Sequence, residues 1–358
     1  MKERYREILH VFLKLGFFAF GGPAAHIAMM EDEVVKKRQW LSREKFVDLL
    51  GFTNLIPGPN STEMAIHLGY IRGGKVGLLI AGISFILPAM LIVLSLAVVY
   101  VGYGSLPAIA GIFNGVKPVI LAIVVLALYR LAKSVLKGWK AGITFIAVLV
   151  FSLFGIKEIP LLLVAGILTL GFSELKKLRS KTLSVEPISL LLLFLTFLKI
   201  GSVLYGSGYV LLAFLESEFV HGFGILTNQQ LLDAVAVGQF TPGPVFTTAT
   251  FIGYLIHGFW GAILATLGIF LPSFLLVYFL QPVFEKLRSS RRISIVLDGV
   301  NAASLALMAS VSLRLGMSTL IDLRSIVIFT VAVILLLRTK INSTYLIFAA
   351  ALIGILFA

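Results

Sequence analysis

Two Pro-Gly-Pro triplets in an otherwise apolar chain carry the residues best suited to bind a ligand. Proline lacks the backbone N–H that a helix needs and crowds the preceding turn, so the triplets at Pro57 and Pro242 must break their helices. The N–H groups that begin the next helix carry partial positive charge, which suits an anion. The alternative is that each triplet is only a turn and that the hydroxyls behind it cap the next helix. The candidate substrate-binding residues around the triplets are Asn54, Pro57, Gly58, Pro59, Asn60, Ser61, Thr62, Gln239, Pro242, Gly243, Pro244, Thr247 and Thr248.

Two lysines within apolar segments form the second group of candidates. Lys14 lies in the sequence FLKLG and Lys199 in FLKIG, each seven residues before a glycine of a helix break. A lysine inside a membrane span costs roughly 2.5 to 3.5 kcal/mol on insertion scales, so it indicates a functional role by default. We expect both ammonium groups to contact an anion; the alternative is that they extend to the membrane surface. The glycine-rich helix breaks that follow the two lysines contain further candidates for substrate binding, which are Gly21, Gly22, Pro23, Gly206, Ser207 and Gly208.

Acidic residues near the triplets suggest how transport of an ion could be coupled to protons. Glu63 is the candidate for proton coupling, because a partly desolvated carboxylate can titrate. The alternatives for Glu63 are an ion pair with Arg72 or Lys75, or a structural bond to the broken helix. We expect Asp48 and Asp233 near the membrane surface, where helices begin. The five histidines show no metal-ligand spacing and the chain has no cysteine, so we expect neither a metal site nor a cofactor.

The composition is that of an integral membrane protein. Of the 358 residues 59% are apolar and only 13% are charged, and the mean hydropathy is +1.02. Several apolar runs approach the roughly 20 residues that cross a bilayer as a helix. The net charge of +13 lies in clusters between these runs, which is typical of cytoplasmic loops and argues against nucleic acid as a partner. We expect a multi-pass protein of the cell inner (plasma) membrane, surrounded by the lipid bilayer.

The chain contains an internal repeat. Adding 185 to a residue number relates FLKLG at Phe12 to FLKIG at Phe197, and the triplet at Pro57 to the triplet at Pro242. Matches of this kind in one register indicate a duplicated unit. We expect an N-terminal repeat at residues 1–175, a cytoplasmic linker at residues 176–187 and a C-terminal inverted repeat at residues 188–358.

Loop charges indicate that the two repeats have opposite orientations. Residues 36–45 include five lysines and arginines, whereas their counterpart in the second half, residues 221–230, has none. Conversely, residues 101–106 of the first half have none, whereas their counterpart, residues 285–292, includes four. Equivalent loops therefore belong on opposite faces. The predicted fold is an all-α, polytopic helical bundle of two inverted-topology repeats, each with about five spans and one re-entrant Pro-Gly-Pro hairpin. This scheme places the start of the chain on the opposite side of the membrane from residues 72–75.

The sequence resembles the chromate transporter family in its long form with two homologous halves. The resemblance covers most of the chain and rests on FGGP at residues 20–23, on the two Pro-Gly-Pro triplets, and on the Leu-Pro pairs at Pro88 and Pro272. It implies secondary transport of the tetrahedral dianion chromate, commonly outward, with sulfate as a structural mimic. The second half departs from the pattern, with Thr248 where the first has Glu63, so the halves need not contribute equally.

The predicted function is therefore secondary active transport of tetrahedral oxyanions, most directly chromate efflux, by one repeat or bundle moving against another. Chromate or sulfate is the expected small-anion substrate, and the sequence leaves open whether the chain forms a homodimer. A passive anion channel is one alternative. An intramembrane enzyme acting on a lipid phosphate is the other, but no catalytic dyad supports it, so we do not expect an enzyme.

Overall fold

The computed structural model describes residues 2–20, 22–53, 56–103, 106–136, 138–156, 158–170, 188–205, 210–280, 291–339, 341 and 343–356. Within these ranges the regular secondary structure is entirely helical. Four of the described helices are long and apolar enough to cross a membrane: Asn60–Tyr103, Ile109–Val135, Val245–Leu280 and Asp298–Thr319. The predicted class, a helical membrane protein, is confirmed. The predicted linker at residues 176–187 lies outside the described residues.

The second helix of the chain turns back beside the first. The chain runs through α1 (Lys2–Phe18), α2 (Gly22–Glu31), the π-helix η1 (Asp32–Lys37), α3 (Arg43–Thr53) and α4 (Asn60–Tyr103). Lys14 of α1 pairs with Glu33 of η1 at 2.9 Å, so η1 lies beside α1. Near the start of α1, Glu7 accepts hydrogen bonds from Trp40 (3.0 Å) and Arg72 (2.8 Å).

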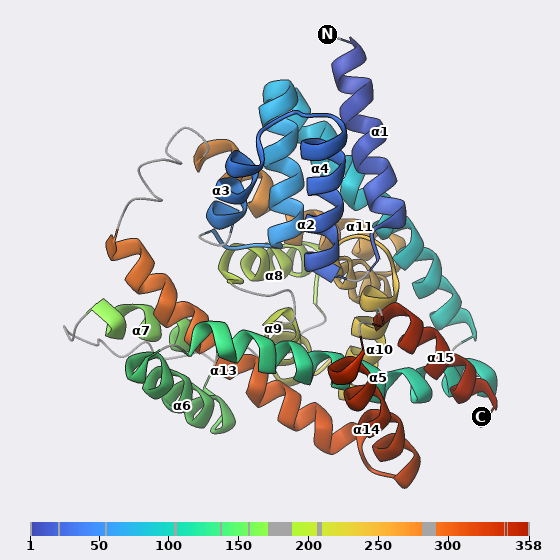
Figure 1. The fold of residues 1–358 in the computed structure, drawn as a ribbon. Helices are drawn as coiled ribbons and strands as arrows, with labels where there is room; N and C mark the ends of the chain where they lie inside the picture. The colour runs from blue at the N-terminus through green and yellow to red at the C-terminus, as the bar shows by residue number, and fades with distance from the viewer. Residues whose placement is uncertain are drawn as a thin grey trace.

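These contacts correct the predicted topology. Because Glu7 bonds to Arg72, the start of α1 lies at the same end of the molecule as residues 72–75. The prediction that the two lie on opposite sides of the membrane is wrong. The physical reason is that the break before Gly22 turns the chain back, so that α1 and α2 do not form one long span (Figure 1).

The helices behind the two triplets reverse direction at a glycine. The second half contains α8 (Leu190–Val203), α9 (Leu211–Leu215), η3 (Glu216–Gly222), α10 (Asn228–Phe240), the 3-10 helix η4 (Val245–Thr247) and α11 (Thr248–Leu280). α4 is interrupted at Gly74 (φ 62°) and α11 at Gly258 (φ 59°), in the left-handed region that glycine tolerates.

Close packing across these turns shows that each long helix folds back on itself. A Cβ built on Gly69 lies 3.0 Å from the carbonyl carbon of Gly77, and one on Gly253 lies 2.7 Å from that of Gly261. Residues eight apart in a straight helix are about 12 Å apart along its axis, so the two arms must lie side by side. Gly74 and Gly258 are 184 residues apart, so the sequence repeat relates the two turns after a slip of one residue from its offset of 185.

The remaining helices pack into a separate layer. They are α5 (Pro107–Val135), α6 (Trp139–Leu153), α7 (Glu158–Leu170), α13 (Arg291–Thr319), α14 (Leu323–Arg338) and α15 (Ser343–Leu356). Helices from the two halves interleave here: a Cβ on Gly115 of α5 lies 2.9 Å from the Cα of Gly354 of α15, and Ser152 of α6 donates to Ser310 of α13 at 3.0 Å.

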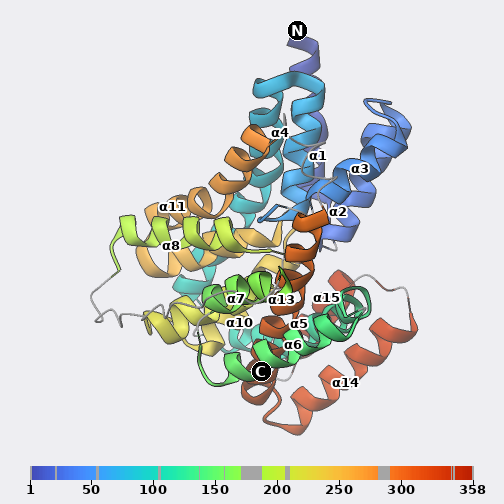
Figure 2. The ribbon, with the colours of Figure 1, turned by 90° about the vertical axis from the view of Figure 1, so that its left-hand side faces the viewer.

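The described helices thus form two composite units, each with contributions from both halves. We call residues 2–103 with 188–280 the hairpin unit, and residues 107–170 with 291–356 the bundle unit. Figures 1 and 2 show most of the bundle unit below α1, α4, α8 and α11, with α9 and α10 of the hairpin unit beside the bundle helices. In the hairpin unit α1 packs on α4 and α8 packs on α11, and the two pairs meet where α4 crosses α11.

Candidate functional site

The two triplets are held by backbone hydrogen bonds that cross between the halves. The N–H of Gly58 donates to the carbonyl of Leu204 at 2.8 Å, and the N–H of Gly243 donates to the carbonyl of Ala19 at 3.1 Å. Leu204 follows α8, and Ala19 follows α1. All four positions obey the 185-residue offset of the sequence repeat, so each half supports the triplet of the other.

The backbone at both triplet centres requires glycine. Gly58 has φ 135° and Gly243 has φ 84°, conformations that residues with a Cβ rarely adopt. A Cβ on Gly58 also lies 2.6 Å from Ser273 Oγ and clashes with Glu63 Oε1, and a Cβ on Gly243 lies 2.7 Å from Ala89 Cβ. The triplets therefore fit tightly against α11 beside Pro272 and against α4 beside Pro88.

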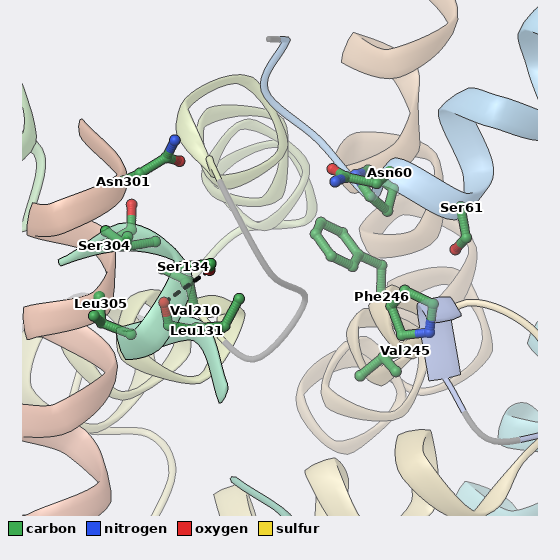
Figure 3. Close-up of a pocket in the computed structure, with 13 residues that line it drawn as sticks. Asn60, Ser61, Leu131, Ser134, Val210, Val245, Phe246, Asn301, Ser304 and Leu305 are labelled. Atoms are coloured by element: carbon green, nitrogen blue, oxygen red, sulfur yellow. Dashed lines mark hydrogen bonds between the residues drawn. The ribbon is translucent and has the colours of Figure 1, made fainter. Parts of the chain in front are cut away.

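A cavity of about 380 Å³ lies between the two units, beside the triplets. On its hairpin-unit side, four chain segments begin a helix: α2, α4, α9 with Val210 as its N-cap, and η4 leading into α11. On the opposite side are α5 and α13 of the bundle unit (Figure 3). Its lining residues are Pro23, Pro59, Asn60, Ser61, Leu131, Ser134, Val135, Val210, Val245, Phe246, Asn301, Ser304 and Leu305.

The polar groups of the cavity are neutral hydrogen-bonding groups. Asn60 and Ser61, in the first turn of α4, lie on one side, and Asn301 and Ser304 of α13 lie on the other, with Ser134 of α5 beside them (Figure 3). The first N–H groups of a helix have no partner within that helix. Such groups, with amides and hydroxyls, bind a small anion without requiring a protonated side chain.

The structure brings some predicted residues to the cavity and places others behind it. Pro23, Pro59, Asn60 and Ser61 line it. The hydroxyls of Thr247 and Thr248 are buried and donate to the carbonyls of Pro244 and Val245, at 2.9 and 2.7 Å. The residues Gly22, Pro57, Gly58, Thr62, Gln239, Pro242, Gly243 and Pro244 lie outside its lining, and Gly21, Asn54, Gly206, Ser207 and Gly208 lie outside the described residues.

Neither predicted lysine lines the cavity. Lys14 pairs with Glu33 at 2.9 Å and Lys199 pairs with Glu218 at 2.7 Å, and both lysine side chains are more than 40% exposed. The two pairs are equivalent under the sequence repeat. Each pairs the first helix of a half with the π-helix of the same half, which is a structural role that the sequence pattern did not distinguish from anion binding.

Glu63 is completely buried directly behind the cavity. Its Oε1 accepts a hydrogen bond from Ser273 of α11 at 3.4 Å. Arg72 instead pairs with Glu7, and Lys75 donates to the hydroxyl of Tyr278. Glu63 thus sits where the first triplet meets the second half of the chain.

Sequence reasoning missed the bundle-unit side of the cavity and misplaced one aspartate. Ser134, Asn301 and Ser304 lie in apolar helices, and their polarity was the signal that could have revealed them. Asp233 was expected near the membrane surface, but it is buried within α10 and paired with Lys117 of α5 at 2.9 Å. Asp233 is therefore not a helix-start residue, because α10 begins five residues earlier, at Asn228 after Thr227 of the capping box.

Comparison with known proteins identifies the family. The family model described as chromate transporter matches residues 6–172 and 191–355. The chain belongs to the chromate transporter family. It is 32% identical to the probable chromate transport protein of Synechococcus elongatus, over 98% of this chain and 95% of that protein. It is 31% identical to the chromate transport protein of Cupriavidus metallidurans, over 98% of this chain and 92% of that protein.

A shorter relative matches only about half of the chain. The uncharacterized transporter YwrB of Bacillus subtilis is 29% identical over 48% of this chain and 88% of its own length. No solved structure matches the chain. Membership of the family supports ion transport across a membrane, and the names of the relatives indicate a transporter rather than an enzyme.

Proposed function

We propose that this family member is a secondary active transporter of tetrahedral oxyanions in the cell inner membrane, with chromate as the substrate and sulfate as a mimic. The observation that carries the proposal is the cavity between the two units, where helix starts and neutral donors converge. Two curated relatives are named chromate transport proteins. Chromate efflux is the direction that we propose.

The chemistry of the cavity suits a dianion that must be released again. Asn60 and Ser61 present donors from the hairpin unit, and Asn301 and Ser304 present donors from the bundle unit, whereas the hydroxyl of Ser134 donates to the carbonyl of Leu131 at 2.9 Å. Each oxygen of a tetrahedral anion can accept hydrogen bonds from a different direction, which matches donors on opposite walls. The lining residues that the structure describes include no lysine or arginine, and binding by partial charges favours moderate affinity and release.

The inverted-repeat arrangement is part of the proposal. The crossed hydrogen bonds at Gly58 and Gly243, and the matched turns at Gly74 and Gly258, support a duplicated unit. The opposite loop charges support opposite orientation in the membrane. With the start of α1 beside Arg72, its basic residues join those of residues 36–45 on one face. Cysteine labelling of residues 101–106 and 257–260 from each side of the membrane tests this. Inversion requires both segments to lie on one face, which is opposite to the face that carries residues 36–45.

Glu63 remains the proposed proton-coupling residue. It is buried one turn behind Asn60, and its neighbour Ser273 belongs to the other half. A proton on this carboxyl group and an anion in the cavity would each alter the contact between the first triplet and α11. This gives a physical route by which proton and anion movements are linked.

Counterflow in proteoliposomes tests the proposed function. Vesicles loaded with unlabelled chromate or sulfate should accumulate labelled sulfate transiently, with saturation and with competition by other tetrahedral dianions. An empty-vesicle control and the monovalent anion nitrate provide the baseline. Flux that does not saturate and never exceeds equilibrium identifies a passive channel instead, and absence of flux for every tetrahedral anion contradicts the proposal.

A further inference from the structure

Buried charges bridge the hairpin unit and the bundle unit at a place remote from the cavity. Lys117 of α5 lies 2.9 Å from Oδ1 of Asp233 of α10, and the hydroxyl of Tyr100, at the end of α4, donates to Oδ2 of Asp233 at 2.8 Å. Among the ion pairs of the described ranges, this is the only one in which both side chains are 6% exposed or less.

The surroundings of this cluster are apolar. The ring of Tyr100 packs against Phe113 of α5 and Phe251 of α11, with centroids 5.2 and 5.1 Å apart. Neighbouring residues of α10, such as Leu232 and Val235, are buried in the same core. Within the described residues, Lys117 and Tyr100 are the ionisable groups that contact Asp233.

A second charged contact also joins the two units. Glu216 of η3 is almost fully buried, and its Oε2 lies 3.3 Å from Nε of Arg314 of α13. Arg314 in turn donates to Ser310 at 3.2 Å, and His221 lies 3.7 Å from Oε1 of Glu216. Both charged contacts therefore join an element of the hairpin unit to a helix of the bundle unit.

Stability does not explain a buried ion pair at this position. The free energy needed to remove two charges from water is about as large as the free energy gained from their attraction. Apolar residues of similar size often stabilise a protein equally well. Ionisable residues inside a membrane protein indicate function by default. The position between two units, rather than within either one, indicates a role in how the units sit against each other.

We propose that transport moves the hairpin unit against the bundle unit, and that Lys117 and Asp233, with Tyr100, are positioning residues that hold the conformation described here. This rests on the proposed transport function and specifies its moving parts, which are not the two sequence repeats. The cavity has one wall in each unit, so such a motion changes both its shape and the face to which it opens.

The geometry separates this contact from anion binding. Lys117 and Leu131 are both in α5, and the 14 residues between their positions correspond to about 21 Å along a helix. Asp233 precedes the second triplet in α10, so the ion pair fixes the helix that leads to Val245 and Phe246. Loss of the pair should therefore change the equilibrium between conformations without removing a donor from the cavity.

A labelling experiment tests the proposal. The chain has no cysteine, so Val135→Cys in the cavity wall introduces a single thiol. Its reaction rate with a membrane-impermeant maleimide is measured from each side of sealed vesicles. Lys117→Met with Asp233→Asn removes both charges together and should leave melting close to that of the parent. We expect the ratio of the two labelling rates to change about tenfold, because the equilibrium between conformations shifts.

Further variants make the result decisive. Tyr100→Phe removes one hydroxyl group, should fold, and should shift the labelling ratio in the same direction by less. The exchanged pair, Lys117→Asp with Asp233→Lys, should restore the parental ratio. A folded double-neutral variant and a Tyr100→Phe variant that both label as the parent does would overturn the proposal. Labelling needs no substrate, so this outcome is distinct from failure of chromate transport, which counterflow reports.

Discussion

Alanine at Gly58 is expected to displace the first triplet and abolish transport. The φ of 135° is strained for any residue with a Cβ, at a cost of about 1 to 3 kcal/mol. The new Cβ also clashes with Glu63 and lies 2.6 Å from Ser273 Oγ, and overpacking of this kind costs about 1 to 3 kcal/mol more.

The combined cost is about 2 to 6 kcal/mol, which is comparable with a large part of a protein's stability. The least costly response is for the triplet to move away from α11, which breaks the hydrogen bond from Gly58 N–H to Leu204. The adjoining first turn of α4 moves with it. Because 1.4 kcal/mol corresponds to a factor of ten, we expect counterflow of sulfate to fall by more than about tenfold.

The assay pairs counterflow with thermal melting in detergent, and the matched control is Gly51→Ala. Gly51 lies in α3, its added Cβ meets nothing within 4 Å, and its φ is not positive. Replacing a helical glycine with alanine stabilises a protein by about 0.5 to 1 kcal/mol, so the control should melt at the parental temperature or slightly above it and transport as the parent does. A Gly58→Ala protein with parental melting and parental flux refutes the reasoning about the triplet.

Three further outcomes are expected. Asn301→Ala and Ser304→Ala should each raise the sulfate KM severalfold and leave the melting temperature unchanged. Each variant removes one hydrogen-bond donor of the cavity, and such a bond contributes about 0.5 to 1.5 kcal/mol. An unchanged KM in both variants would show that α13 is not part of the site. Glu63→Gln should keep counterflow but lose uptake driven by an imposed pH gradient, and retained pH-driven uptake excludes Glu63 as the coupling residue. Lys14→Met removes one of three cationic partners of Glu33, which keeps Lys37 at 3.2 Å and Arg38 at 2.8 Å, so it should lower the melting temperature only slightly and leave the sulfate KM unchanged. A changed KM at unchanged stability would return Lys14 to the binding site.

Apolar patterning and the repeat made much of the architecture predictable. Long apolar runs can only be helices in a bilayer, and the Pro-Gly-Pro triplets could not lie within a helix. The prediction that helix breaks gather at one place agrees with the cavity beside Pro59 and Asn60.

Other features depended on contacts between distant residues, which spacing alone does not reveal. The start of α1 is fixed beside α4 by Glu7 with Arg72, 65 residues apart. The pairing of Lys14 with Glu33 similarly gives that lysine a partner that composition could not assign. The packing of α13 against α5 places Asn301 across the cavity from Asn60, and no local pattern encodes that arrangement.

The position of chromium in crystals grown with chromate tests the central claim most directly. Anomalous scattering locates the metal atom of the anion without any assumption about its ligands. The account predicts one ordered chromium between Asn60 and Ser61 on one wall and Asn301 and Ser304 on the other. An ordered chromium elsewhere, such as beside Lys14 or Lys199, in protein that transports chromate would contradict it.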